Sequence, residues 1–301
     1  MSDSTLSPAS AALALPQPRA MLELVKPVTW FPPMWAYLCG IVSAGVWPES
    51  WWLILLGVVL AGPIVCGMSQ AANDWCDRHV DAINEPHRPI PSGRIPARWG
   101  FGIALAMSGL ALVVGWHLGT WGFWATVAAV LAAWAYSAPP VRLKRSGWWG
   151  PGLVGLCYET LPWITGAAVA LAAGPRFEIL AIALLYGLGA HGIMTINDFK
   201  AIEGDRRMGI RSLPAVYGPD DAARMAATVM GLAPAIVIPL LVIWGAPWHA
   251  LAVFALLMVQ FWATARWMRD PMRLARWFNG AGVGPYVLGM MVAALALGGL
   301  A

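Results

Sequence analysis

The sequence predicts an all-α protein that crosses a membrane many times, and its composition and its long apolar segments support this fold class. Hydrophobic residues make up 59% of the 301 residues, whereas charged residues make up only 11%. Soluble domains carry about 25% charged residues, so the composition excludes an ordinary soluble enzyme. The apolar segments are long enough to cross the roughly 30 Å hydrocarbon core, and a backbone in lipid satisfies its polar groups by forming helices.

Nine of these segments are predicted to be transmembrane helices. They cover residues 28–46, 51–73, 99–117, 119–137, 152–173, 177–198, 222–243, 247–267 and 281–300. Proline removes an N–H from the helical ladder, so we expect kinks at the prolines inside these segments, which are Pro63, Pro162, Pro234 and Pro239. Residues 1–20 are rich in Ser, Ala and Pro and are expected to form a disordered tail, not a cleaved signal. Residues 21–301 then form one domain.

The basic residues test this arrangement, because cytoplasmic loops carry an excess of Lys and Arg. With nine spans, 18 of the 19 Lys and Arg residues fall on one side, and only Arg176 falls on the other. We therefore expect the N-terminus and the long polar loops, with any active site, to face the cytoplasm. The net charge of +4 is then a consequence of topology and does not indicate nucleic-acid binding.

A charged stretch, NDWCDRHVDAINEPHRPIPSGR at residues 73–94, follows the second predicted span. Asp74, Asp77 and Asp81 are three and four residues apart, so they share one face of a helix. Three neighbouring carboxylates repel one another, and a hard divalent cation would remove the repulsion. Oxygen ligands favour Mg²⁺ over Zn²⁺. The structural alternative is a solvated helix end with scattered charge.

The stretch NDFKAIEGD at residues 197–205 repeats this pattern at the end of the sixth predicted span. Both stretches begin with Asn-Asp-aromatic and place an Asp eight residues after the Asn. Asp198 and Asp205 are seven residues apart and hence on one face. Ala201 occupies the position that matches Asp77, and Glu203 is a candidate to replace the missing carboxylate. Two parallel helices could thus present two acidic clusters across one cavity.

Two acidic clusters among many basic residues indicate a diphosphate ligand. Mg²⁺ would bridge the diphosphate to the carboxylates, and Arg and Lys would bind the remaining oxygens. The apolar interior of the helical bundle would hold a long tail, so the predicted function is that of an enzyme acting on an isoprenoid diphosphate. The predicted diphosphate contacts, each of which could equally be a positive-inside anchor, are Arg78, Arg88, Lys144, Lys200 and Arg211.

Three runs of the sequence resemble the chlorophyll synthase branch of the UbiA-like intramembrane prenyltransferase superfamily. They are NDWCDRHVDAINEPHRPIPSGRIP, WAYSAPPVRLKRSGWWGPG and HGIMTINDFKAIEGDRRMGIRSLPAVYG, and the similarity covers nearly everything after residue 20. The resemblance implies a UbiA-like bundle in a bacterial photosynthetic membrane. It also implies that the propionate of bacteriochlorophyllide a is esterified with geranylgeranyl or phytyl diphosphate, with release of pyrophosphate. Pigment-assembly proteins are possible partners.

The resemblance also assigns roles to residues. The first Mg²⁺-diphosphate motif of the family is matched by Asn73, Asp74, Asp77 and Asp81, and the second by Asn197, Asp198 and Asp205 with Glu203 inside it. The superfamily has an Asp where Ala201 stands, which leaves one or two Mg²⁺ ions possible. Tyr136 and Lys144 match a Tyr and a Lys near the diphosphate. The predicted catalytic residues are Asp74, Asp77, Asp81, Asp198, Asp205 and Lys144.

Two deeper polar residues are candidates for the acceptor pocket. Glu159 lies inside the fifth predicted span, where an ionised acid is costly and usually functional. His191 lies on the face of Asp198 but deeper in the sixth span. Both could also be packed structural groups. The alternative functions are prenyl transfer to a haem or quinone precursor and, from another class, transport. Transporters usually place their binding residues near the bilayer midplane, unlike these two acidic clusters.

Overall fold

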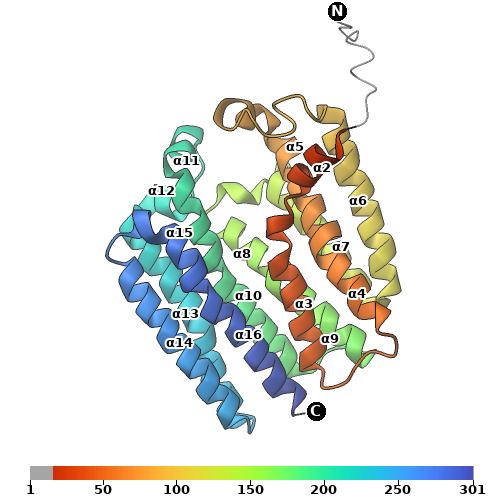
Figure 1. Ribbon diagram of the computed structural model, residues 1–301, viewed down its shortest axis with the longest axis vertical. Coiled ribbons are helices and arrows are strands. Elements are labelled where there is room, and N and C mark those ends of the chain that lie inside the picture. The colour runs from red at the N-terminus through yellow and green to blue at the C-terminus, as the bar shows by residue number, and fades with distance from the viewer. Residues whose placement is uncertain (1–15, 301) are drawn as a thin grey trace, which may run out of the picture.

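The computed structural model describes residues 16–300, with the backbone alone at Asn84, and Figure 1 shows these residues as a helical bundle. The described chain contains no β-strand; one isolated parallel bridge joins Ser146 and Arg211. The α-helices are α2 (Pro18–Val25), α3 (Phe31–Ser43), α4 (Trp52–Val59), α5 (Gly67–Asn84), α6 (Ala97–His117), α7 (Gly119–Ser137), α8 (Trp149–Gly155), α9 (Leu161–Leu171), α10 (Phe177–Asn197), α11 (Ile202–Met208), α12 (Leu213–Tyr217), α13 (Pro219–Ile243), α14 (Pro247–Trp267), α15 (Pro271–Ala281) and α16 (Val283–Gly298). Shorter helical segments are η1 (Pro27–Thr29), η2 (Leu60–Cys66), η3 (Leu143–Arg145), η4 (Leu156–Thr160) and η5 (Asp198–Ala201).

Within the described residues, seven helical stretches are long and apolar enough to cross a membrane. They are Trp52–Ile83, Ala97–His117, Trp149–Leu171, Phe177–Met208, Pro219–Ile243, Pro247–Trp267 and Pro271–Gly298. The other two predicted spans correspond to α3, which has 13 residues, and α7, which has 19 residues and three Trp that lower its hydropathy. The predicted all-α membrane class is confirmed, whereas the count of nine spans stays a prediction.

Helices α3 and α9 join two hydrophobic clusters. One cluster contains buried side chains of α10, α13, α14 and α16, the other those of α2, η2, α5 and α6, and α3 and α9 contribute to both. Their crossing is very close: a Cβ added to Gly40 would lie 2.1 Å from the Trp163 carbonyl oxygen, and one added to Gly166 would lie 2.1 Å from that of Tyr37. Small residues permit such backbone contact between membrane helices. The close packing of α3 against α9 thus connects the two hydrophobic clusters.

Two π-helical segments interrupt the long helices. Pro63 lies inside η2, and Pro162 is the second residue of α9, directly after η4. A proline that removes a ladder hydrogen bond widens or bends a helix, and these two prolines lie in or directly after a π-helical segment, whereas the predicted kinks stay predictions. Pro234 and Pro239 lie within α13, which continues unbroken from Pro219 to Ile243.

Both acidic motifs lie at one end of the bundle. Figure 1 shows α11, α12, α2 and the C-terminal end of α5 there, and the C-terminus of the chain at the opposite end. Arg176 belongs to that opposite end, because its Nη2 donates to the Leu297 carbonyl oxygen at 3.0 Å near the end of α16. The distribution of basic residues predicted from the sequence therefore matches the two ends of the bundle.

Candidate active site

A cavity of about 800 Å³, here called the carboxylate cavity, lies between the end of α5, the α7–α8 connection and η5–α11. Carboxylates from both motifs line it: Asp77 and Asp81 from α5, and Asp198 and Asp205 from the second motif. The predicted pairing of the two acidic clusters across one cavity is therefore present in the fold. Its basic lining residues are Arg88, Arg142, Lys144, Arg145, Lys200 and Arg207.

The first motif is held by ion pairs. Asp77 accepts from Arg142 Nη2 at 2.7 Å and from Lys144 Nζ, while Asp81 accepts from Arg88 Nη1 at 2.9 Å. Arg142 has a left-handed backbone, φ 40°, which turns the chain just before η3. Burial lowers the pKa of Lys144, although the Asp77 charge opposes the shift. The cavity therefore contains cations already directed at the carboxylates.

Asp74 is fully buried and does not line the cavity. Its Oδ1 accepts from Lys26 Nζ at 2.7 Å and from Arg88 Nη1 at 3.4 Å, and its Oδ2 has no hydrogen-bond partner among the described residues. Arg88 also contacts Asp81 and Glu85. Burial opposes the charge of Arg88, but these three acids raise its pKa overall. Arg88 thus separates Asp74 from the cavity and neutralises the deep end of the motif.

The carboxylates of the second motif are not ion-paired. Asp198 begins η5, and Asp205 in α11 accepts from Ser212 Oγ at 2.5 Å. No Lys or Arg of residues 16–300 forms an ion pair with either carboxylate. Glu203 reaches only the rim, where its side chain is 72% exposed and pairs with Arg207. Ala201 lines the wall without a carboxylate, so the second motif presents two clear cavity ligands.

Several predicted ligands point elsewhere. Asn197 Oδ1 accepts from Asn279 Nδ2 at 2.9 Å, on the side of α15. The Arg78 guanidinium lies 4.7 Å from the centre of the Trp75 ring and donates to the Trp75 carbonyl. Arg211 lines a neighbouring groove and not the carboxylate cavity.

The two predicted acceptor residues do not line the carboxylate cavity either. Glu159 is buried in η4, and its Oε2 has no hydrogen-bond partner among the described side chains. His191 is buried in α10 with its ring 5.2 Å from that of Trp148. Neither residue is brought next to the carboxylates.

The sequence analysis missed four basic residues of the site, one of which is Arg207 in the cavity lining. Lys26 contacts Asp74, Arg142 contacts Asp77, and Arg145 lines the cavity. A local signal exists for the last two, because Arg142, Lys144 and Arg145 crowd one short polar run. Nothing local marks Lys26 as a partner of Asp74, which lies 48 residues further along the chain.

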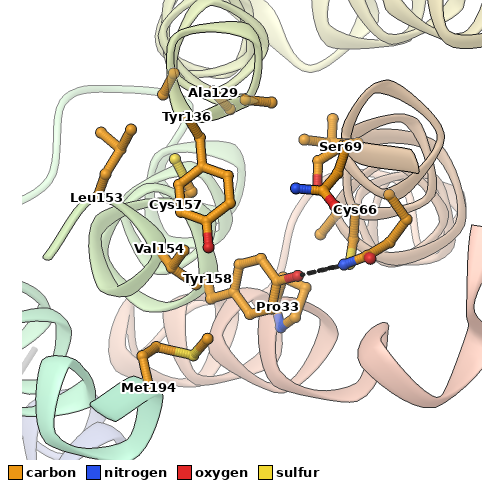
Figure 2. Close-up of a pocket in the computed structure, with 16 residues that line it drawn as sticks. Pro33, Cys66, Ser69, Ala129, Tyr136, Leu153, Val154, Cys157, Tyr158 and Met194 are labelled. Atoms are coloured by element: carbon orange, nitrogen blue, oxygen red, sulfur yellow. Dashed lines mark hydrogen bonds between the residues drawn. The ribbon is translucent and has the colours of Figure 1, made fainter. Parts of the chain in front are cut away.

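An apolar cavity of about 190 Å³ adjoins the carboxylate cavity. Asn73, Tyr136, Val154 and Met194 line both. Figure 2 shows Tyr136 and Tyr158 projecting into it between the helices, and the Tyr158 hydroxyl lies 3.3 Å from Gln70 Nε2. Residues of η2 and η4 form opposite walls, which is consistent with the frequent use of π turns at functional sites.

The apolar path continues beyond this cavity into a smaller space of about 40 Å³ that reaches Tyr37. The two share the wall residues Ala61, Val65, Ala129 and Cys157. Polar and apolar spaces thus follow one another from the bundle end inward, as an amphiphile with an anionic head and a long tail requires.

Comparison with known proteins identifies the family. A model of the UbiA prenyltransferase family matches residues 33–283. The chain belongs to the UbiA prenyltransferase family. It is 68% identical over 304 residues to the bacteriochlorophyll synthase 33 kDa chain of Rhodobacter capsulatus, with 99% of each chain covered. The chloroplastic chlorophyll synthase of Arabidopsis thaliana is 36% identical, covering 91% of this chain and 73% of the relative. The predicted chlorophyll synthase branch of the family is confirmed.

The fold of the family is also recognisable among solved structures. A UbiA homolog from Archaeoglobus fulgidus, solved with DMAPP and Mg²⁺, superposes with a TM-score of 0.66 at 20% identity, covering 92% of this chain and 98% of the other. At that identity the likeness establishes the UbiA fold. The predicted prenyltransferase class is confirmed by the family match and by the near-full-length relatives.

The donor atoms of the carboxylate cavity fit Mg²⁺, which prefers oxygen ligands. In the described part of the chain, however, no three His, Cys, Asp or Glu side chains surround a single point. Mg²⁺ is usually bound by one or two carboxylates together with substrate phosphates. The unpaired Asp198 and Asp205, which line the same cavity as Asp77 and Asp81, suit that mode.

Proposed function

We propose that this protein is a Mg²⁺-dependent prenyltransferase that esterifies the propionate of bacteriochlorophyllide a with geranylgeranyl or phytyl diphosphate and releases pyrophosphate. The observation that carries the proposal is the joined pair of cavities, one lined by carboxylates and cations and the other apolar. The near-full-length similarity to a bacteriochlorophyll synthase chain supports the choice of acceptor.

The diphosphate occupies the carboxylate cavity in this proposal, and the isoprenoid tail lies in the apolar cavity. Arg88, Arg142 and Lys144 bind the non-bridging oxygens, because they already line the wall beside the carboxylates. The boundary between head and tail falls at Asn73 and Tyr136, which line both cavities. Lys200 and Arg145 supply further positive charge at the mouth.

The metal is held by Asp77, Asp81, Asp198 and Asp205, with Asn73 beside them and Asp74 as an indirect support through Arg88. When bound, Mg²⁺ stabilises negative charge on the departing pyrophosphate. In this arrangement Glu203 adds a carboxylate at the rim of the cavity, and Asn197 helps to position η5 through its hydrogen bond with Asn279. The number of bound ions, one or two, depends on whether another group replaces the carboxylate that is missing at Ala201.

The side chains of the cavity stabilise the transition state electrostatically. As the allylic C–O bond breaks, its electron pair leaves on the diphosphate, and the fixed cations Arg88, Arg142 and Lys144 face the developing charge. The attacking propionate forms the new C–O bond. Its pKa is about 4, so it is ionised at neutral pH. The chain therefore needs no general base, and none of the cavity residues is assigned to that role.

The proposed orientation places the N-terminus and both acidic motifs on the cytoplasmic side of the membrane, with nine spans in total. It is supported by the basic residues gathered at the bundle end that holds the motifs, since cytoplasmic loops are enriched in Lys and Arg. Labelling of single cysteines in intact spheroplasts would test it. A cysteine at Ser92 should be protected from an impermeant reagent, and one at the 80% exposed position Trp248 should react; the opposite pattern would refute this orientation.

The activity is tested by assaying the purified protein with geranylgeranyl diphosphate and three acceptors: bacteriochlorophyllide, haem and 4-hydroxybenzoate. The expected result is an ester of bacteriochlorophyllide formed only with Mg²⁺. Asp205→Ala and Asp74→Ala should both lose activity while the protein remains folded. Ester formation in the absence of a divalent cation, or prenylation of haem or hydroxybenzoate alone, would contradict the proposal.

A further inference from the structure

A groove of about 490 Å³, here called the outer groove, lies on the other side of the wall that bounds the carboxylate cavity. The two spaces share Arg142, Arg145, Ser146 and Gly147. This wall is fixed by backbone hydrogen bonds: Gly147 N donates to the Arg211 carbonyl at 2.8 Å, and Arg211 N donates to that of Arg145 at 2.9 Å. The outer groove is thus separated from the proposed diphosphate site by a single, well-anchored strip of chain.

The lining of the outer groove combines apolar and aromatic surface with positive charge. Val141, Trp148, Val216 and Tyr217 line it and are about half exposed, between 45% and 56%. Large apolar side chains exposed together often mark a binding site. They surround a polar groove at the same bundle end as α12 (Figure 1), next to the connection between α7 and α8.

Arg145 and Arg211 supply the charge. Both line the groove and are exposed, and neither forms an ion pair with a carboxylate of residues 16–300. Arg142, in contrast, is committed to Asp77 on the cavity side. An arginine can stack on a conjugated ring and also pair with a carboxylate. The groove therefore offers two uncommitted cations beside two aromatic rings.

The acceptor of the reaction needs a site of this kind. Bacteriochlorophyllide is a broad, planar conjugated ring that carries a carboxylate. The apolar cavity, at about 190 Å³, is too small for it, and the carboxylate cavity presents acidic groups to an apolar ring. The outer groove has a volume in the range of small-molecule sites, roughly 300–1,000 Å³, and it contains no acidic lining residue in the described chain.

We propose that the outer groove binds the acceptor macrocycle, with its ring against Trp148 and Tyr217 and its propionate directed across the Arg145 edge into the carboxylate cavity. This inference rests on the proposed placement of the donor diphosphate. Donor and acceptor then approach the reacting centre from opposite sides of residues 142–147. Arg145, which lines both spaces, meets the propionate at the crossing point.

The test fills the groove without touching the carboxylate cavity. Val216→Trp adds bulk at a half-exposed position that lines only the outer groove, and Val242→Trp makes the same change at an exposed position of α13 that lines neither space. Val216→Trp should raise the KM for bacteriochlorophyllide at least about tenfold and leave the KM for geranylgeranyl diphosphate within about twofold. Val242→Trp should change neither. An unchanged acceptor KM in Val216→Trp would overturn the proposal.

A second pair of variants tests the charge. Arg145→Ala should weaken binding of bacteriochlorophyllide, measured by the shift of its absorption spectrum in the absence of donor, and should affect its neutral methyl ester much less. Arg224→Ala, which removes an exposed Arg paired with Asp221, is the control and should affect neither. Equal losses for acid and ester would rule out the carboxylate contact at Arg145 and overturn the proposal.

Anionic lipid headgroups carry a negative charge, as the propionate of the acceptor does. The assays are therefore run in phosphatidylcholine vesicles with and without phosphatidylglycerol. If the groove instead holds a lipid, phosphatidylglycerol will stimulate the wild type but not Val216→Trp, and the KM for bacteriochlorophyllide will be the same for the two proteins. That result overturns the proposal. Failure of the wild type to form any ester would instead count against the proposed function, so the two failures are distinguishable.

Discussion

Replacement of Asp198 by Asn tests the electrostatic reasoning most directly. Asp198 lines the carboxylate cavity, and no Lys or Arg of the described chain forms an ion pair with it. Asn keeps the shape of the side chain and removes only the charge. Because no cation loses a partner, we expect the thermal unfolding midpoint of Asp198→Asn to stay close to that of the wild type.

The expected loss of activity follows from the charge that is removed. Two unit charges about 4 Å apart interact by about 4 kcal/mol at an effective dielectric constant near 20. The remaining carboxylates and water recover part of this energy, and loss of one preorganised electrostatic contact usually costs about 10²–10³ in rate. We therefore expect kcat/KM for the prenyl diphosphate to fall about 10²–10³-fold and the Mg²⁺ concentration at half-maximal rate to rise.

Ester formation at varied Mg²⁺ and donor concentrations measures both effects. Asp221→Asn is the matched control, because it makes the same chemical change at an exposed carboxylate that is not part of the cavity lining. It should leave both parameters unchanged. Activity of Asp198→Asn within about threefold of the wild type, at the same Mg²⁺ requirement, would refute a metal-binding role for the second motif.

Three further outcomes are expected. Chelation of Mg²⁺ with EDTA should abolish ester formation but leave the unfolding midpoint unchanged without donor, because no three described acidic side chains surround a metal by themselves; a lower midpoint would indicate a structural ion. Ala133→Phe should fill part of the apolar cavity and lower the use of geranylgeranyl relative to dimethylallyl diphosphate about tenfold, whereas Leu131→Phe, at a 65% exposed position, should not. Gly40→Ala should destabilise the fold by about 1–3 kcal/mol through overpacking against α9, measured by thermal unfolding in detergent. Gly109→Ala, where an added Cβ meets nothing within 4 Å, is its control.

The helical class and the meeting of the two acidic motifs could be predicted because both depend on local pattern. Hydropathy marks the long helices, and a spacing of three, four or seven residues fixes which carboxylates share a face. The carboxylates at Asp77 and Asp81 and those at Asp198 and Asp205 therefore line one cavity as predicted.

Other parts of the site depend on tertiary contacts that no local pattern encodes. Asp74 shares the face of Asp81, but Lys26 and Arg88 cover it. Arg142 reaches Asp77 because of its left-handed backbone conformation. The sequence does not predict this conformation for an arginine. Asn197 is turned toward Asn279 because α10 ends there and continues as a tighter 3₁₀ turn.

The close crossing of α3 and α9 has a consequence for how substrates enter. Since both helices belong to both hydrophobic clusters, the two sides of the bundle cannot separate without disturbing the close packing of Gly40 against Trp163 and of Gly166 against Tyr37. Access to the reacting centre must then come from movement of the connecting segments at the bundle end, residues 85–96 and 138–147, or from lateral passage of the tail between helices. A covalent link between α3 and α9 would accordingly leave turnover intact, whereas a link that fastens those two segments together would trap or exclude the donor.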